Sequence, residues 1–291
     1  DITNRKRQSY SQEFRIKNNL KNNKILTSGI YYSKIKESDI RDGWIFAGSA
    51  TNIHSIFDIL NYAVYTQVVY PITENLLISS TLRVDINDTK QNLNYNLYDE
   101  SNSYYNEIKD DALIGGSIKI NYQYSKALIF NTFLSRGYKT SGINQSQYDG
   151  NEETQGFDEE FRIYDTESCN NIEIGINYTT KKYNLKLSTF YMHRDNPQLR
   201  LSHQYDSTNP TSFDYATYNA KTAYHYGFEA DFIMNFSEFL TISESFSLLK
   251  TYVSEFEYRG ITYGNRELSH SPKQKYSIGF LYDFSKYIKG L

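Results

Sequence analysis

Cysteine, proline and long hydrophobic runs are all scarce in this chain. Of its 291 residues, one is cysteine (Cys169) and four are proline. A single cysteine excludes an intrachain disulfide framework and any zinc site built from several cysteines. The mean hydropathy is −0.65, and no segment approaches the roughly 18 to 20 apolar residues that a spanning helix requires. A membrane protein built of helices is therefore excluded.

Basic charge is not in excess either. The chain has 31 Lys and Arg residues against 34 Asp and Glu residues, and its net charge is −3. Because nucleic-acid-binding proteins carry a basic footprint, no nucleic acid partner is expected. The sequence has no Gly-x-Ser-x-Gly element and no His-x-x-x-His spacing, so it predicts no enzyme, no cofactor and no resident metal site.

Aromatic residues are abundant, with 29 Tyr and 17 Phe, and apolar residues recur at every second position. In the clearest run, residues 58–70, Leu60, Tyr62 and Val64 share one face. A period of two is typical of a strand with one apolar face. Eleven segments show it to differing degrees, namely 7–17, 25–36, 58–70, 76–87, 112–124, 127–139, 168–178, 183–194, 218–235, 239–254 and 272–284.

The connections between these segments alternate in length. Short ones fall at about 18–24, 71–75, 125–126, 179–182 and 236–238. Long ones fall at about 37–57, 88–111, 140–167, 195–217 and 255–271. Outer-membrane barrels join strands by short periplasmic turns and longer extracellular loops. The sequence therefore predicts an all-β fold, an antiparallel transmembrane β-barrel meander with all long connections at one end.

Aromatic residues also gather where the predicted strands meet the short turns. They are Tyr70, Tyr122, Tyr124, Tyr178, Tyr183, Phe236, Phe239, Phe284 and Tyr287. Aromatic rings favour the depth of lipid headgroups, so this clustering indicates an interfacial girdle. The alternative is cross-strand aromatic pairing in a soluble sandwich, which would not require five long loops at one end.

Several segments, taken in order, resemble the C-terminal half of the barrel domain of TonB-dependent outer-membrane receptors. The most specific is Ser135-Arg136-Gly137-Tyr138-Lys139-Thr140-Ser141-Gly142-Ile143-Asn144, which is similar to the family's S-x-GYK-x-GG-x-N element. Residues 11–16, 29–32 and 226–229 continue the series at the expected spacings, and Pro272 opens the last strand as in the family.

The resemblance implies a barrel of 22 strands in the outer membrane of a Gram-negative bacterium, filled by an N-terminal plug that TonB pulls. It implies energised uptake of a scarce ligand, most often a ferric siderophore, and contact with outer-membrane lipid and lipopolysaccharide. Since eleven strands leave two open edges, residues 1–291 are expected to be a partial barrel domain without the plug, the first strands and the last strands. A passive porin-like or structural barrel is the alternative function.

Charged residues at the positions that alternate with the apolar ones are expected to point inward, line a polar lumen and pack against the plug. Ligand contact is the alternative role. They are Arg83, Asp85, Lys119, Lys139, Glu173, Glu229 and Asp231. His193, His203 and His225 flank one long loop and are candidates for ligand contact, with ordinary loop or lumen positions as the alternative.

Two further features qualify this interpretation. Loops 88–111 and 140–167 hold fourteen carboxylates against three basic residues, so their rim is expected either to repel an anionic ligand or to be a solvated surface beside lipopolysaccharide phosphates. Glu244 shares the parity of Ile242 and Phe246 and would face lipid, where a charge is costly. A bulge or a register error would remove that conflict.

Overall fold

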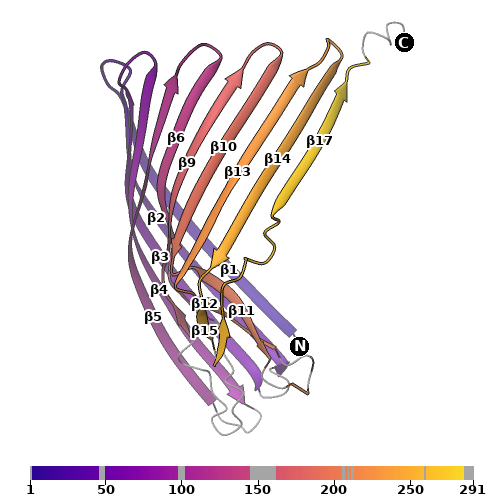
Figure 1. Ribbon diagram of the computed structural model, residues 1–291. Helices are drawn as coiled ribbons and strands as arrows, with labels where there is room; N and C mark the ends of the chain where they lie inside the picture. The colour runs from indigo at the N-terminus through magenta and orange to yellow at the C-terminus, as the bar shows by residue number, and fades with distance from the viewer. Residues whose placement is uncertain are drawn as a thin grey trace, which may run out of the picture.

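The computed structural model describes residues 2–45, 50–97, 102–144, 162–204, 207–208, 210, 213–258 and 260–284. Eleven strands form one antiparallel sheet whose spatial order follows the chain, curved into a half-cylinder (Figure 1). Among the described residues, no helix is long and apolar enough to cross a membrane.

Three small hairpins are inserted in the long connections between strands of the main sheet. The main strands are β1 (Ile2–Asn19), β2 (Ile25–Ile45), β3 (Ala50–Pro71), β4 (Leu76–Leu97), β5 (Asn102–Gln123), β6 (Leu128–Lys139), β9 (Glu167–Thr179), β10 (Tyr183–Asp195), β13 (Thr222–Asn235), β14 (Leu240–Val253) and β17 (Gln274–Tyr282). The hairpins are β7 (Gly142–Ile143) with β8 (Ile163–Tyr164), β11 (Gln198–Gln204) with β12 (Phe213–Asn219), and β15 (Phe256–Tyr258) with β16 (Ile261–Tyr263).

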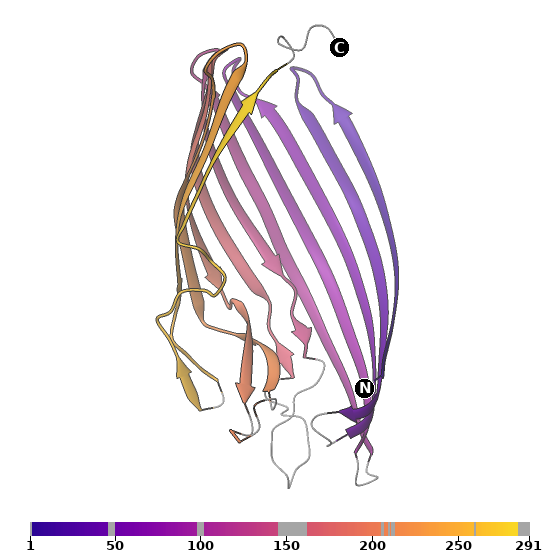
Figure 2. The same ribbon diagram turned by 90° about the vertical axis from the view of Figure 1, so that its right-hand side faces the viewer.

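The eleven predicted strands and the antiparallel meander are confirmed. Figures 1 and 2 show the short turns at one end of the half-cylinder and the small hairpins of the long connections at the other. In the turn between β1 and β2, Asn22 and Asn23 adopt φ values of 61° and 57°. Asparagine tolerates this left-handed region, which lets the chain reverse within a few residues.

Two of the predicted long loops are wrong in extent, because the first five strands are much longer than expected. Residues 37–45 belong to β2 and residues 50–57 to β3, and most of 88–111 belongs to β4 and β5. These extensions are held by continuous cross-strand pairing, such as Asp39 with Ser55. Their outward positions are largely polar, so the hydrophobic alternation that marked the strands is missing there.

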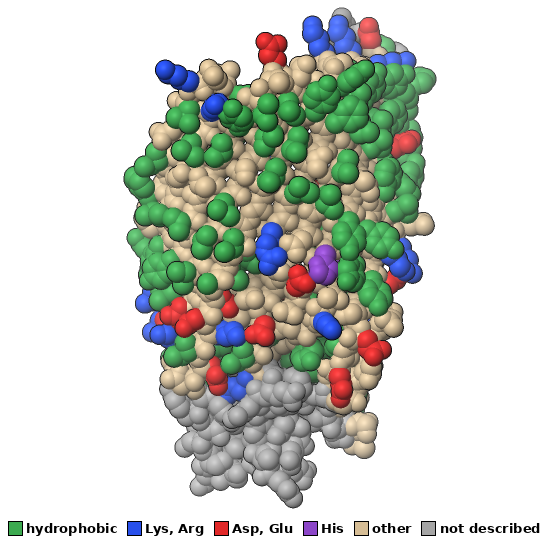
Figure 3. All heavy atoms as spheres, turned by 60° about the vertical axis from the view of Figure 1, so that its left-hand side comes forward, with side chains coloured by type: hydrophobic (Ala, Val, Ile, Leu, Met, Phe, Trp, Pro, Cys, Tyr) green, Lys and Arg blue, Asp and Glu red, His purple; other side chains and the backbone are tan. Residues whose placement is uncertain are grey.

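The two faces of the sheet differ as the parity predicted. Ile118, Ile174 and Phe280 lie on the convex face and are 43%, 52% and 67% exposed in this chain. Register joins equivalent positions across strands, for example Ile118 with Leu134. Figure 3 shows hydrophobic side chains spread over much of this face, with charged side chains concentrated toward its ends. Lys119 and Glu173 alternate with these apolar residues and take the concave face.

The expected aromatic girdle at the short-turn end is present among the described residues, and its predicted member Tyr287 lies outside them. A second row lies nearer the long connections. In the second row Tyr10 and Tyr32 have ring centroids 6.0 Å apart, and Tyr32 and Tyr62 are 5.2 Å apart. Along β3, Tyr62 and the girdle residue Tyr70 enclose the apolar band over about 27 Å of strand. Because strands of outer-membrane barrels tilt by about 35–45°, this length corresponds to a height of about 20 Å, near the roughly 25 Å of the apolar band between two such girdles.

Glu244 keeps its place on the apolar face. It lies opposite Phe232 on β13 and opposite Ile278 on β17, and both pairings run without a register shift. Neither a bulge nor a register error therefore removes the conflict.

Replacing Ile174 by lysine places a charge in the middle of the apolar band. The full-length protein should lose about 2–4 kcal/mol of unfolding free energy in bilayers, measured by urea titration of its heat-modifiable gel mobility. Ser188→Lys on the concave face, opposite Glu229, is the control and should be tolerated. Equal losses for both variants would contradict the assignment of faces.

Removing the Glu244 charge should have the opposite effect. Glu244→Leu is expected to raise the unfolding free energy by about 1 kcal/mol, because a carboxylate no longer faces hydrocarbon. The neighbouring Ser245 donates a hydrogen bond to Asp231 on the concave face, so Ser245→Leu should give no gain in the same titration. A loss of stability in Glu244→Leu would show that the carboxylate has a favourable partner.

Candidate functional site

The concave face carries two clusters of paired charges. In the first, Arg83 and Asp85 both project from β4, and Arg83 donates hydrogen bonds of 2.7 and 2.8 Å to the two carboxylate oxygens. Asp85 is buried and also accepts hydrogen bonds from Asn61 at 3.2 Å and from the Tyr138 hydroxyl. The Arg83 guanidinium lies 5.4 Å from the ring centroid of Tyr31. These contacts hold the Arg83 side chain at a fixed position on the wall.

Tyr138 reaches this cluster through a split in the sheet. Pairing between β5 and β6 ends at Gly116 and Arg136, whereas β5 extends back to Asn102. A Cβ atom at Gly115 would lie 2.6 Å from the Tyr138 ring. Glycine at position 115 therefore provides the space in which the tyrosine crosses the wall.

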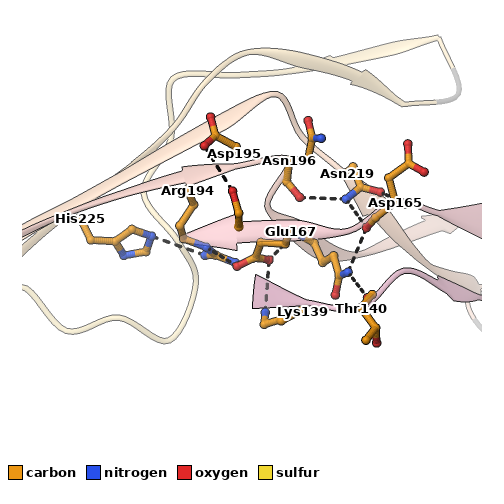
Figure 4. A network of polar contacts seen from close by, with 11 residues as sticks. Lys139, Thr140, Asp165, Glu167, Arg194, Asp195, Asn196, Asn219 and His225 are labelled. Carbon is orange, nitrogen blue, oxygen red and sulfur yellow. Dashed lines mark hydrogen bonds and ion pairs between the residues drawn. The ribbon is translucent and has the colours of Figure 1, made fainter. Parts of the chain in front are cut away.

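The second cluster surrounds Glu167 at the start of β9 (Figure 4). Arg194 on β10 donates hydrogen bonds of 2.7 and 2.8 Å to the two oxygens of this carboxylate. The Lys139 amine lies 3.3 Å away, and the Gln198 backbone N–H donates at 2.7 Å. Glu167 is 4% exposed. Bidentate pairing of arginine with a carboxylate fixes both direction and distance.

The pKa of Glu167 lies below its ordinary value of about 4.5. Burial alone would raise the pKa, but the hydrogen bonds from Arg194 and Gln198 favour the charged form and outweigh it. The residue stands beyond the second tyrosine row, at the long-connection end. The carboxylate is therefore ionised at neutral pH and anchors Arg194 and Lys139.

Side-chain amides extend this cluster into the long connections. The Gln198 amide donates to the backbone oxygens of Thr140 at 2.8 Å and Asp165 at 3.0 Å. Asn219 donates to the backbone oxygen of Asp165 at 3.0 Å and accepts from its N–H at 2.7 Å. The segments 140–144, 162–167 and 196–219 are thereby tied to one another at the end of the barrel wall.

The same connections fold onto the concave face of the tall strands. Ser141 donates two hydrogen bonds, from its N–H and its hydroxyl, to the Asp111 carboxylate on β5. Asn144 exchanges two hydrogen bonds of 2.8 Å with the backbone of Thr217 on β12. Figure 2 shows the small hairpins gathered at this end of the half-cylinder. At the long-connection end, which we call the mouth, the concave side of the sheet is therefore partly covered by segments that are anchored at several points.

Two of the hairpins also share a small apolar core. Tyr258 on β15 is 1% exposed and packs with Ala216 on β12. The ring centroids of Tyr218 and Phe256 are 5.9 Å apart. This packing makes β11–β12 and β15–β16 one unit beyond the apolar band.

The predicted lumen residues divide into two groups. Arg83 and Asp85 form the first cluster, and Lys139 belongs to the second. The other four lie on the concave face nearer the short turns and do not join either cluster; they are Lys119, Glu173, Glu229 and Asp231.

The three candidate histidines do not form one site. The His193 ring lies on the convex face, 4.9 Å from the centroid of Tyr224. His225 lies on the concave side, 3.5 Å from the Arg194 guanidinium. His203 lies in β11 opposite Asp214. Within the described ranges, no three His, Cys, Asp or Glu residues are arranged to hold a metal ion.

The acidic connections are partly neutralised. Asp165 pairs with Lys109 at 2.9 Å, and Glu107 lies 3.6 Å from Arg162. Residues 98–101 and 145–161, which together contain eight of the fourteen carboxylates, lie outside the described residues. Among the described residues, the expected repulsion is therefore weakened by Lys109, Arg162, Lys139 and Arg194.

Charge and chemistry along the sequence do not identify Arg194 or Gln198 as functional residues. Alternation along 183–194 puts Arg194 on the concave face, but its partner Glu167 is identified only by the register of β9 and β10. Tyr138 and Asn144 were contained in the S-x-GYK-x-GG-x-N resemblance, which indicated the segment and not its contacts.

Substituting Glu167 by glutamine tests the second cluster. At pH 7 the unfolding free energy should fall by about 3 kcal/mol, because Arg194, whose side chain is only 15% exposed, loses its counter-charge. The folded pKa of Glu167 is lowered, so its stabilisation is complete above about pH 4.5 and is lost as the pH falls through the folded pKa. Melting temperatures of the two proteins should therefore converge in acid, and a pH-independent difference would contradict an ionic origin.

The family described as TonB dependent receptor-like, beta-barrel, matches residues 2–290. No curated protein sequence matches the chain. Solved structures with a similar fold include the ferric yersiniabactin uptake receptor FyuA from Yersinia pestis, with 16% identity and a TM-score of 0.74 over 96% of this chain and 40% of that one.

Two other similar structures are the siderophore receptor PiuA from Acinetobacter baumannii and the copper transporter OprC. PiuA has 14% identity and a TM-score of 0.70, covering 96% of this chain and 44% of that one. OprC has 12% identity and a TM-score of 0.72, covering 97% and 43% respectively. The chain thus spans less than half the length of each. At these identities the structures show a shared fold, and the match over residues 2–290 places the chain in the TonB-dependent receptor-like β-barrel family.

Proposed function

We propose that this chain forms part of the barrel wall of an outer-membrane receptor that imports a scarce metal chelate by a TonB-dependent mechanism. The observation that carries the proposal is the family match over residues 2–290, on a sheet whose convex face is apolar and whose concave face holds anchored charges. A wall of this kind can span a bilayer while enclosing a polar passage.

The barrel is completed, in this proposal, by strands outside residues 1–291. Within the described residues, β1 and β17 are the two ends of the sheet order and each has one neighbour. Unpaired strand edges cannot be satisfied in hydrocarbon. Further strands and a plug domain would close the wall and fill its lumen, and TonB would act through that plug.

The proposed ligand is a ferric siderophore or a similar metal chelate. Support comes from the relatives, among which are a ferric yersiniabactin uptake receptor and a copper transporter. The concave charges would serve the plug and the ligand in different places. Arg83 and Lys139 stand nearer the mouth and could contact ligand, whereas Lys119, Glu173, Glu229 and Asp231 stand deeper and would pack against the plug.

Energised uptake is tested with the full-length protein in its own outer membrane. Deleting the gene should reduce accumulation of radiolabelled iron supplied as a matching chelate, and the complementing gene should restore it. Removing TonB should abolish that uptake, because the plug can be displaced only by an energised partner.

The purified full-length protein provides the second measurement. Liposomes containing it should show no steady conductance, since a plug fills the lumen. Steady conductance together with TonB-independent uptake would overturn the proposal in favour of a passive porin-like barrel.

A further inference from the structure

Three side chains that carry soft or neutral metal-binding atoms are neighbours on the concave face. They are Cys169 on β9, Met192 on β10 and His225 on β13. Met192 lies directly opposite His225, and Cys169 is two residues along β9 from the partner of Met192, Asn171. On one face of a sheet, opposite positions have Cβ atoms about 4.5–5.5 Å apart and diagonal positions about 7–8 Å apart. We call these three residues the soft-donor group.

Alternation along the strands turns the soft-donor group toward the lumen. His193 is on the convex face beside Tyr224, so the preceding residue Met192 points to the concave side. Cys169 lies opposite Arg194, which belongs to the second cluster on the same concave side. All three side chains of the group are partly exposed, so an ion in the lumen can reach them.

The imidazole of His225 presents a nitrogen lone pair at this place. Its Nε2 lies 3.5 Å from the Arg194 guanidinium (Figure 4). Because arginine only donates hydrogen bonds, Nε2 is the acceptor in this contact and the proton of the neutral ring is on Nδ1. A hydrogen bond of 3.5 Å is weak, so a metal ion can replace Arg194 at that nitrogen.

The charges around the soft-donor group suit a monovalent cation. Arg194 is already balanced by Glu167, to which it donates hydrogen bonds of 2.7 and 2.8 Å. A cysteine loses its proton when it binds a metal ion, so the Cys169 thiolate and one monovalent cation are neutral together. Binding therefore adds no net charge to the partly buried wall.

The chemistry of the donors selects the kind of ion. Thiolate and thioether sulfur atoms favour Cu(I), and imidazole also suits copper, whereas Mg²⁺, Ca²⁺ and Mn²⁺ prefer oxygen ligands. Within the described ranges, no three His, Cys, Asp or Glu side chains form a metal-binding group. The third donor here is instead a methionine, which is not among the usual zinc ligands. Because the donors come from three different strands, no spacing in the sequence indicates them.

We propose that Cys169, Met192 and His225 form a lumen site for a soft monovalent metal ion, with Cu(I) as the ion. Its ligands are the thiolate, the thioether and Nε2 of the imidazole. The site goes beyond the import of a metal chelate, because it binds an unchelated ion with side chains of the wall alone. It lies beside the second cluster, near the mouth.

The test is a titration of purified full-length protein in detergent with Cu(I), kept reduced by ascorbate, in competition with the coloured chelator bathocuproine disulfonate. C169S, M192L and H225Q should each weaken one bound equivalent of Cu(I) at least about tenfold, because even the loss of an outer-shell partner costs about 10–100-fold in metal affinity. X-ray absorption should show sulfur neighbours of the copper in the unchanged protein and fewer of them in C169S and M192L.

The chain supplies matched controls on the convex face. Met234 is the only other methionine of residues 1–291, and it lies opposite Tyr183 and Ile242. His193 is the matching histidine. M234L and H193Q should bind Cu(I) as tightly as the unchanged protein. Heat-modifiable mobility verifies that each variant is folded.

Two results would overturn the proposal. They are unchanged Cu(I) binding in both C169S and M192L, and weakening of equal size in M234L or H193Q. Neither measurement uses a chelated metal or TonB. A failure of energised uptake would therefore leave the Cu(I) result standing, and a failure of Cu(I) binding would leave the uptake result standing.

Discussion

The backbone hydrogen bonds between neighbouring strands are the interaction on which the rest of this structure depends. They fix the register, and in a sheet a slip of one residue moves every side chain to the other face. Here register keeps Ile118 beside Leu134 on the convex face and Lys119 beside Phe133 on the concave face. Both the apolar band and the polar interior follow from that alignment.

Register also sets depth along the barrel wall. Tyr32 pairs with Tyr62 across β2 and β3, and Tyr224 pairs with Tyr252 across β13 and β14. Each pair therefore lies at a similar depth, with ring centroids 5.2 Å apart in the first pair and 6.2 Å apart in the second. Since the rows mark where the apolar band ends, they separate the part of each strand suited to hydrocarbon from the part that extends past it. Glu167 and its partners stand on the latter side.

The eleven strands and their faces could be predicted from one sequence because alternation along a strand is local information. The extension of β2 through Asp39 could not, because Asp39 is inward and buried beside Arg5, a residue 34 positions away. The contact of Arg194 with Glu167 likewise depends on how two strands align. Alternation along the sequence predicts the face on which each of these residues lies. The contact partner of each residue is known only from the register of the strands in the structure.

Charge pairing differs between the two faces of the same strands, and that difference is informative. On β1, Arg5 points to the concave side and pairs with Asp39 at 2.7 Å. Lys6, the next residue, points to the convex side and has no carboxylate partner in the described chain. On the same face Lys36 lies opposite Asp58, without a direct ion pair between them in the described chain. Asp39 is buried and therefore requires a direct partner, whereas the outward charges are exposed and can be solvated by water.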